Sequence, residues 1–269
     1  MMRVLVLPSM CMHGAFAAGA LAGLETIGIS ANYFKAIIGT SSGGWNGAYS
    51  LTGQLPKEGL RLWAEHVPNG FLQWRRCRPY ADLAYLEHIT RYREALDIRR
   101  LHKSKTDLFA TVTDMETRNA YHVHLNAEVC PIPYLIAGSA IPILSKPQKI
   151  NGRCYGDGAL TNAIPIRFAE NLGADEIWII LNTPEGHRNS WTQWKIISLF
   201  AQSGTERELL VASIKQKNKI FCEIEQRSDL RVIRPRFTLP ISRFTRDPQE
   251  MRFLIEMGRK AALKNIRAM

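Results

Sequence analysis

Ser41 lies in a segment whose residue types suit nucleophilic catalysis, IIGTSSGGWNGAYS at residues 37–50. The pentapeptide GTSSG at residues 39–43 fits G-x-S-x-G, in which a strand turns sharply into a helix and carries the serine at the apex. The two glycines relieve crowding in such a turn, and the helix N-terminus directs partial positive charge at a developing oxyanion. A close-packed turn with an idle serine is the alternative. A phosphate-binding loop is disfavoured, because the lysine of G-x-x-x-x-G-K-[ST] is missing.

Asp157 is a candidate for the base that a serine nucleophile needs. The segment YGDGA at residues 155–159 sets this acid between two glycines, just after a polar Asn151-Gly152 turn. This pattern predicts a carboxylate on a tight loop that other backbone can approach closely. From these residues alone, an ordinary Asp-Gly turn remains the alternative.

A histidine could complete a triad instead. The order Ser41, then Asp157 or Asp175, then His187 matches the order found in α/β-hydrolases. His187 lies in TPEGHRNS, directly after an apolar run that predicts a strand. No further motif supports this triad, so it is kept as an alternative.

The elements that would position these residues follow an alternating order. Two strand-to-helix units within the first 52 residues predict a parallel sheet with helices on both faces. Residues 55–103 mix Leu, Trp and Tyr with many arginines, which predicts amphipathic helices covering one end of the sheet. Strands are expected at 3–7, 34–38, 108–113, 120–125, 176–181 and 230–233, and further helices at 14–26, after Ser42, and at 132–140, 191–226 and 247–266.

The composition is that of a folded protein, with 46% hydrophobic and 22% charged residues in a chain of 269. Repeats, low-complexity tracts and Gly/Ser linkers are absent from the sequence. We therefore expect one domain over residues 1–269, with its core at about 3–182 and a helical, basic portion at about 188–269.

The net charge of +11 favours anionic partners. The last 40 residues carry ten Lys and Arg against three Asp and Glu, a local net charge of +7. Peripheral contact with an anionic membrane surface is one interpretation, and a solvated helical face is the other. Nucleic-acid binding is not expected, because no recognition motif accompanies the charge.

The five cysteines are scattered and form no Cys-x-x-Cys pair, so we expect no zinc site and a reducing compartment. No apolar run is long enough for a membrane span. The first 25 residues have some features of a signal peptide, but Pro8 and His13 interrupt the apolar core and favour a strand, a loop and a helix. A cytoplasmic or peripheral membrane location is expected, with secretion as an effector as the alternative.

Three ordered segments together carry a family resemblance. The run LVLPSMCMHGAFAAGAL, then GTSSGG, then AGSAIPILSKPQKINGRCYGDGALTNAIPIRFAENLGAD resembles the patatin-like phospholipases over residues 3–182, with a weaker echo near the C-terminus. The resemblance implies a three-layer α/β/α sandwich with a central, mainly parallel sheet. It also implies a Ser-Asp dyad without histidine, in which the serine is Ser41 and the aspartate of the D-G-[GA] motif is Asp157. Gly39 and Gly43 complete the serine motif, and Gly158 and Ala159 the aspartate motif.

The loop after the first strand departs from the family pattern. The family has G-G-G-x-[RK]-G there, and its N–H groups form the oxyanion hole, whereas this chain has SMCMHG at residues 9–14. His13 replaces the family's basic residue. The expected backbone donors are Met10 and Cys11, with Ser42 at the helix start. If this loop requires positive φ, its side chains make that conformation costly.

The expected function is calcium-independent hydrolysis of acyl esters, with phospholipids or other acyl-ester lipids as substrates. An acyl-enzyme on Ser41 and proton transfer by Asp157 would carry it, without a metal or other cofactor. No segment resembles a D-x-[DN]-x-[DN]-G calcium loop. A catalytically weak or inactive lipid-binding protein of the same fold is the first alternative, and a Ser-His-Asp esterase acting on soluble esters is the second.

Overall fold

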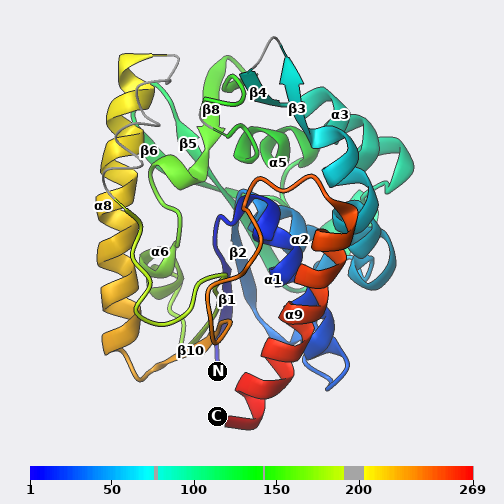
Figure 1. Ribbon diagram of the computed structural model, residues 1–269, viewed down its shortest axis with the longest axis vertical. Helices are drawn as coiled ribbons and strands as arrows, with labels where there is room; N and C mark the ends of the chain where they lie inside the picture. The colour runs from blue at the N-terminus through cyan, green and yellow to red at the C-terminus, as the bar shows by residue number, and fades with distance from the viewer. Residues whose placement is uncertain (76–77, 142, 191–202, 269) are drawn as a thin grey trace.

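The computed structural model describes residues 1–75, 78–141, 143–190 and 203–268 of the chain. Its centre is a twisted sheet in the order β10-β9-β1-β2-β5-β8-β7, with β6 also paired to β5 (Figure 1). Strands β10, β9, β1, β2 and β5 run parallel to one another, whereas β6, β7 and β8 form antiparallel pairs. The strand bounds are β1 Arg3–Leu7, β2 Ala36–Thr40, β5 Asp107–Asp114, β6 Asn119–His124, β7 Gln148–Ile150, β8 Arg153–Asp157, β9 Glu176–Ile180 and β10 Leu230–Ile233.

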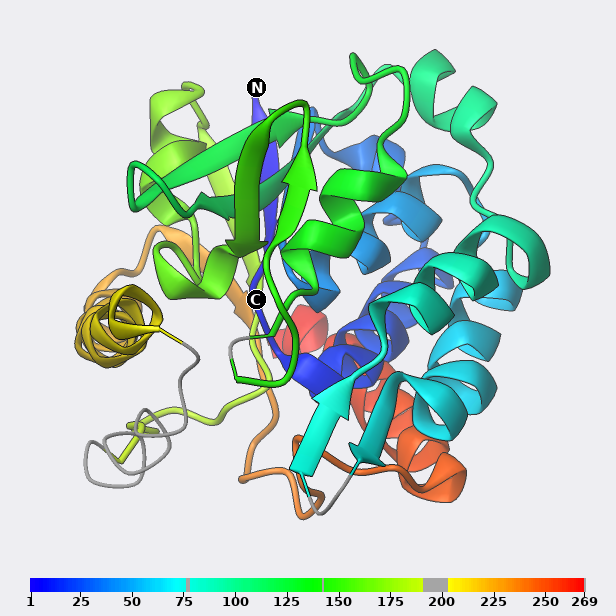
Figure 2. The same cartoon turned by 90° about the horizontal axis from the view of Figure 1, so that it is seen from above.

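Helices cover both faces of this sheet, as Figures 1 and 2 show. Alternate residues of β1 point to opposite faces, and each set enters a different core. Leu5 and Leu7 pack with α1 (Gly14–Glu25), α2 (Ser42–Leu51) and α9 (Pro248–Ala268). Val4 and Val6 pack with α6 (Ile166–Asn171) and α8 (Gly204–Gln226). The expected α/β/α sandwich with a mainly parallel sheet is therefore the observed fold.

The C-terminal helix packs on the N-terminal one with almost no space between their backbones. A Cβ added to Gly19 of α1 would lie 1.9 Å from the carbonyl oxygen of Ile255, and one added to Gly258 of α9 would lie 1.9 Å from that of Phe16. Glycines on both helices therefore permit a contact that any other residue would prevent. Asp247 caps α9 by accepting a bond from Gln249 N–H, at the predicted start of this helix.

The helical cover over one end of the sheet contains more than the predicted helices. Its helical segments are Leu55–Gly59, Leu62–Phe71, α3 Leu83–His88, Ile89–Arg93 and α4 Ile98–Lys103. An antiparallel hairpin of β3 (Leu72–Arg75) and β4 (Arg78–Ala81) interrupts them. The sequence did not predict this hairpin, because its short arginine-rich strands show little apolar alternation. None of the described helices has both the length and the apolar character that crossing a bilayer requires.

Other predicted elements differ from the structure mainly at their ends. The second strand is Ala36–Thr40 rather than 34–38, and the helix at 132–140 is α5, Ile132–Gly138. The helix expected at 191–226 is observed from Gly204, and residues 191–202 lie outside the described part of the chain. Strands β7 and β8 and helix α6 were not predicted. These short segments alternate polar and apolar residues too briefly for a periodic signal.

Candidate active site

Ser41 occupies the turn between β2 and α2 with φ 54° and ψ −122°, a backbone conformation that L-residues rarely adopt. This sharp turn requires glycine at both flanking positions. A Cβ on Gly39 would lie 2.4 Å from Gly44 N, and one on Gly43 would lie 2.0 Å from the carbonyl oxygen of Leu7. The serine side chain therefore lies at the apex of the turn, at the N-terminus of α2.

The pairing of β5 brings Asp157 to this turn. One edge of β5 pairs with β6, so β2 and β8 share the other edge. Strand β2 runs along this edge in the direction of β5 and ends with Thr40 paired to Thr111. Strand β8 runs in the opposite direction and ends with Asp157 paired to the next residue of β5, Val112. The two strands therefore end head to head, and Ser41, the residue after Thr40, meets Asp157 there. Asp157 ends a strand, which corrects the prediction that it lies on a loop.

Ser41 and Asp157 are joined directly. Ser41 Oγ donates a hydrogen bond of 2.8 Å to Asp157 Oδ2, and both side chains are buried. Burial raises the pKa of the Asp157 carboxyl to about 6, while the bond from Ala159 N–H, the Ser41 hydroxyl and the charge of Lys217 act in the opposite direction. The carboxylate is thus a stronger base than a free aspartate, yet it is mainly ionised at pH 7.

The structure explains why glycine and alanine follow Asp157 in the D-G-A motif. A Cβ on Gly158 would lie 2.2 Å from the carbonyl oxygen of Thr111, so the chain can pass β5 this closely only with glycine. Ala159 N–H donates a bond of 2.8 Å to Asp157 Oδ1. Thr113 Oγ1 donates to the Asp157 carbonyl at 2.8 Å and ties the same turn to β5. These contacts hold the carboxylate in one orientation, with Oδ2 toward Ser41.

The loop that follows β1 lies beside Ser41 and carries the expected oxyanion donors. Cys11 has φ 50°, so the loop does adopt positive φ at a residue with a side chain. Met10 N–H donates a bond of 3.1 Å to Ser42 Oγ, and this bond occupies one of the three expected donors. The N–H groups of Cys11 and Ser42 have no acceptor among the described residues. Their binding of an oxyanion remains a prediction.

Hydrogen bonds to distant segments hold this loop. Met12 N–H donates to the carbonyl oxygen of Arg243 at 3.3 Å. His13 Nε2 lies 2.8 Å from the carbonyl oxygen of Ile241, and His13 Nδ1 lies 3.0 Å from Asn182 Nδ2. An amide donor at Nδ1 and a carbonyl acceptor at Nε2 select the neutral tautomer, and burial lowers the pKa of this histidine. His13 therefore supplies hydrogen bonds and no positive charge.

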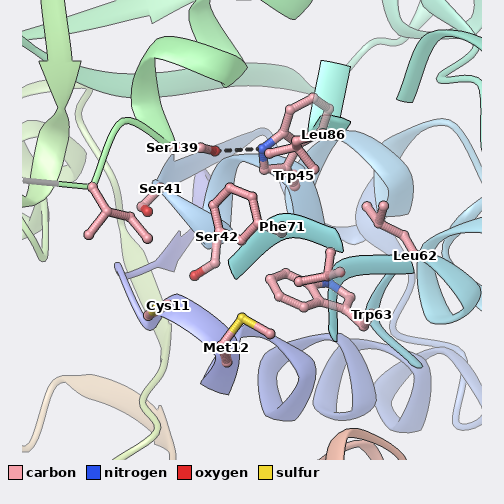
Figure 3. Close-up of a pocket in the computed structure, with 12 residues that line it drawn as sticks. Cys11, Met12, Ser41, Ser42, Trp45, Leu62, Trp63, Phe71, Leu86 and Ser139 are labelled. Atoms are coloured by element: carbon pink, nitrogen blue, oxygen red, sulfur yellow. Dashed lines mark hydrogen bonds between the residues drawn. The ribbon is translucent and has the colours of Figure 1, made fainter. Parts of the chain in front are cut away.

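An apolar pocket opens on one side of Ser41 (Figure 3). Trp45 of α2, Leu62, Trp63 and Phe71 of the helical cover and Leu86 of α3 line it, and Cys11, Met12, Ser41 and Ser42 form its end. Trp45 Nε1 donates to Ser139 Oγ at 2.8 Å and Trp63 Nε1 to Asn46 Oδ1 at 2.6 Å, so the polar atoms of both rings are satisfied. The cavity volume open to the centre of a water molecule is about 30 Å³, enough for a water molecule or two.

The members of the alternative triad do not converge. Asp175 Oδ2 accepts a bond of 2.6 Å from Met2 N–H, at the starting ends of β1 and β9, whereas Ser41 follows the opposite end of the sheet. His187 packs edge-on against Phe221. Its Nε2 is buried without a hydrogen-bond partner in the described residues, and no hydrogen bond joins it to Ser41 or Asp157.

Two cations near the site were missed by the sequence analysis. Lys217 of α8 donates to the carbonyl oxygen of Ser9 at 3.5 Å, and Arg243 lies in the segment that binds Met12. Both charges act on the Cys11 thiol, whose pKa burial raises to about 12. Neither residue stands in a motif. Among the described residues, no group of three or more His, Cys, Asp and Glu side chains is arranged to hold a metal ion.

A serine on a strained strand-to-helix turn, hydrogen-bonded to a buried aspartate on an α/β/α sandwich, is an arrangement that suits nucleophilic catalysis of the kind used by hydrolases. The family comparison agrees with this class. Residues 5–170 match the model described as patatin-like phospholipase, and the chain belongs to this family of lipid hydrolases.

A solved structure supports the same fold. The chain is similar to VipD from Legionella pneumophila, with a TM-score of 0.59 and 11% sequence identity. The match covers 99% of this chain and 66% of that one, so the chain spans about two thirds of its length. At this identity the likeness concerns the fold alone. No curated protein matches the sequence.

Proposed function

We propose that this protein is a serine acyl hydrolase that cleaves the fatty-acyl esters of phospholipids through a Ser41–Asp157 dyad. The observation that carries the proposal is the 2.8 Å bond from Ser41 Oγ to Asp157 Oδ2 at the strained turn. Membership of the patatin-like phospholipase family supports the lipid substrate class.

In the proposed first step, Ser41 Oγ attacks the ester carbonyl carbon while its proton passes to Asp157 Oδ2. The carbonyl oxygen becomes an oxyanion, for which the N–H groups of Cys11 and Ser42 and the N-terminus of α2 are the candidate partners. Collapse of this intermediate breaks the bond to the alcohol, which leaves with the proton held by Asp157. The fatty acid is then bound to Ser41 as an ester.

The second step reverses these roles with water. Asp157 accepts a proton from a water molecule that attacks the acyl-enzyme, and the fatty acid leaves as Ser41 recovers its proton from Asp157. A pKa near 6 suits a group that must alternately accept and return a proton at neutral pH. Because no step of this mechanism involves calcium, we propose that the activity is calcium-independent.

The apolar pocket beside Ser41 is the proposed acyl-chain site. Its lining of Trp, Leu and Phe side chains suits a hydrocarbon chain. The cavity volume of about 30 Å³, counted for the centre of a water molecule, shows that the pocket is narrow. Binding of an acyl chain is proposed to widen this pocket between α2 and the helical cover.

The basic C-terminal portion is the proposed contact with an anionic membrane surface. Phe237, Phe244 and Phe253 are exposed in this portion, and each of them directly follows an arginine. Exposed aromatic rings beside basic residues suit the interface of an anionic bilayer. Binding to anionic vesicles should exceed binding to neutral ones and should weaken as salt rises. Equal binding to both at low salt would contradict this contact.

Hydrolysis of a mixed lipid extract, with the products identified by mass spectrometry, tests the function. Released fatty acids and lysophospholipids are the expected products, and activity should persist in EDTA. A fluorophosphonate probe should label Ser41. No labelling and no hydrolysis, with retained lipid binding, would favour the inactive lipid-binding alternative. A loss in His187→Ala as large as that in Ser41→Ala would favour the triad acting on soluble esters.

A further inference from the structure

Two positively charged residues adjoin the loop at residues 9–13, and neither of them lines the apolar pocket. The pocket is lined from α2 and the helical cover, whereas Lys217 comes from α8, on the opposite side of the end of β1 (Figure 2). Lys217 Nζ lies 3.5 Å from the carbonyl oxygen of Ser9, and Arg243 belongs to the segment whose carbonyl accepts the bond from Met12 N–H. Both cations therefore adjoin the loop at residues 9–13, whose other side ends the acyl pocket.

The Lys217 ammonium has no carboxylate partner among the described residues. Other cations on this side of the molecule are paired: Arg188 with Glu225 at 2.6 Å, and Arg227 with Glu170 at 2.5 Å. By contrast, Lys217 makes no ion pair in the described chain, and its one hydrogen bond is the long contact with Ser9. A half-buried ammonium without a counter-ion destabilises the folded protein. An anion that binds there during function would offset this cost.

The electrostatic environment of Lys217 agrees with this interpretation. Burial and the nearby charge of Arg243 lower the pKa of Lys217 to about 8, while Asp157 and Cys11 act in the opposite direction. The ammonium is therefore mainly protonated at pH 7. The charge of Arg243 repels the Lys217 ammonium, which has no ion pair of its own among the described residues. A doubly or singly charged anion would relieve that repulsion.

We infer that Lys217, with Arg243 beside it, forms a subsite for a phosphate on the alcohol side of the scissile ester. The inference rests on the proposed function and extends it. The acyl chain lies in the apolar pocket, the ester carbonyl lies at Ser41, and the phosphate of the leaving group lies against the Lys217 ammonium. His13 is neutral, so these cations from distant elements supply the positive charge that the loop itself lacks.

The test compares two water-soluble substrates with the same acyl chains: dihexanoylphosphatidylglycerol and dihexanoylglycerol. Lys217→Met removes the charge and keeps an apolar stem, Lys217→Arg restores a cation, and Lys219→Met removes an exposed lysine from the same helix as a control. Lys217→Met also removes a charge that acts on Asp157, so its effect on the subsite is the difference between the substrates: kcat/KM for the phospholipid should fall at least ten-fold more than kcat/KM for the neutral ester. Lys217→Arg and Lys219→Met should keep the preference of the wild type. An equal loss on both substrates, or a loss on neither, would overturn the inference.

Binding measured without turnover separates this inference from the proposed function. In the Ser41→Ala protein, calorimetry should detect dihexanoylphosphatidylglycerol, and adding Lys217→Met should weaken that binding ten-fold or more. This result supports the subsite even if the wild type hydrolyses neither ester, an outcome that would refute only the proposed function. Inorganic phosphate should bind much more weakly than the phospholipid. Equally tight binding of inorganic phosphate, with the same dependence on Lys217, would assign the site to free phosphate and overturn the leaving-group role.

Discussion

Two strand-to-helix turns lie side by side in this protein, and each holds a non-glycine residue at positive φ by different means. Both follow neighbouring parallel strands, β1 and β2, at the same end of the sheet. Both carry a non-glycine residue at positive φ, Cys11 at 50° and Ser41 at 54°. The turn at Ser41 is flanked by glycines that neighbouring backbone requires. The turn at Cys11 has no glycine within residues 9–13 and is held by hydrogen bonds to distant segments.

The difference shows how strain can be maintained in an active site. At Ser41 the strain is enforced locally, because the strand and helix touch where Gly39 and Gly43 lie. At Cys11 the strain depends on the segment at residues 241–243 and on Asn182, both far away in the sequence. The first turn should therefore tolerate almost no substitution of its glycines. The second should respond mildly to a change of side chain, since its backbone is held from outside.

The largest expected effect is on the nucleophile. Ser41→Ala should lower ester hydrolysis by about 10⁴-fold or more and abolish fluorophosphonate labelling, because the attacking oxygen is removed. The fold should persist, since alanine adds no bulk to the turn. Ser50→Ala, near the other end of the same helix, is the matched control and should retain full activity. Activity and thermal unfolding measured on both variants check the prediction, and appreciable residual labelling of Ser41→Ala would contradict it.

The next largest effect concerns Asp157, whose substitution should separate activity from stability. Asp157→Asn should lower kcat by about 10³-fold or more, because an amide cannot accept the Ser41 proton. It should also stabilise the fold at pH 7.5. A carboxyl with a folded pKa near 6 and an ordinary value of 3.8 destabilises the folded state above pH 6, and this penalty disappears as pH falls below 4. The difference corresponds to at most about 3 kcal/mol.

Urea unfolding of the wild type and Asp157→Asn at pH 7.5 and pH 5 measures this gain, which should shrink toward the lower pH. Asp114→Asn is a control of opposite sign, because backbone N–H bonds from Thr117 and Glu116 hold the pKa of Asp114 below its usual value. That variant should lose stability at pH 7.5. For the wild-type enzyme, kcat/KM should rise with pH through about 6 as Asp157 ionises. A stability loss in Asp157→Asn at pH 7.5 would contradict the inferred burial penalty.

Substitution of two adjacent glycines, Gly43 and Gly44, tests whether local contact enforces the serine turn. Gly43→Ala should destabilise the protein by about 3 kcal/mol or more, because its Cβ would lie 2.0 Å from the backbone of Leu7. Gly44→Ala is the matched control, since its Cβ would meet a flexible Leu135 methyl group at 3.1 Å. It should change stability by less than about 1 kcal/mol. Thermal unfolding of the two variants measures both changes in stability. Similar losses of stability in both variants would mean that local contact does not enforce the turn.

The smallest effect is expected at the other turn. Cys11→Gly should stabilise the protein by about 1 kcal/mol, because glycine adopts positive φ without strain. Activity should change by less than ten-fold, since the hydrogen bonds of the loop hold its backbone in either case. Cys11→Ala keeps a Cβ and is the control that should show no such stabilisation. A ten-fold gain in rate for Cys11→Gly would instead show that the native side chain holds the oxyanion donors out of alignment.

The sequence by itself determined the features that depend on neighbouring residues. The strand at residues 3–7, the serine turn and the helix after it were predicted from an apolar run, two glycines and a stretch of small residues, because local sterics restrict such a segment to few conformations. The family resemblance pointed to Asp157 as the partner of Ser41. From the residues around it alone, the same aspartate was also compatible with an ordinary turn, and Asp175 and His187 were open alternatives.

Only the tertiary structure decided the features that depend on distant residues. Ser41 and Asp157 are 116 positions apart, and they meet because β2 and β8 end head to head on β5. Burial in this setting, rather than any local motif, raises the pKa of Asp157. Lys217 looked like any other basic residue of a surface helix. Its position beside the loop at residues 9–13 follows from the packing of α8, because no short-range pattern records which face of a helix meets an active site.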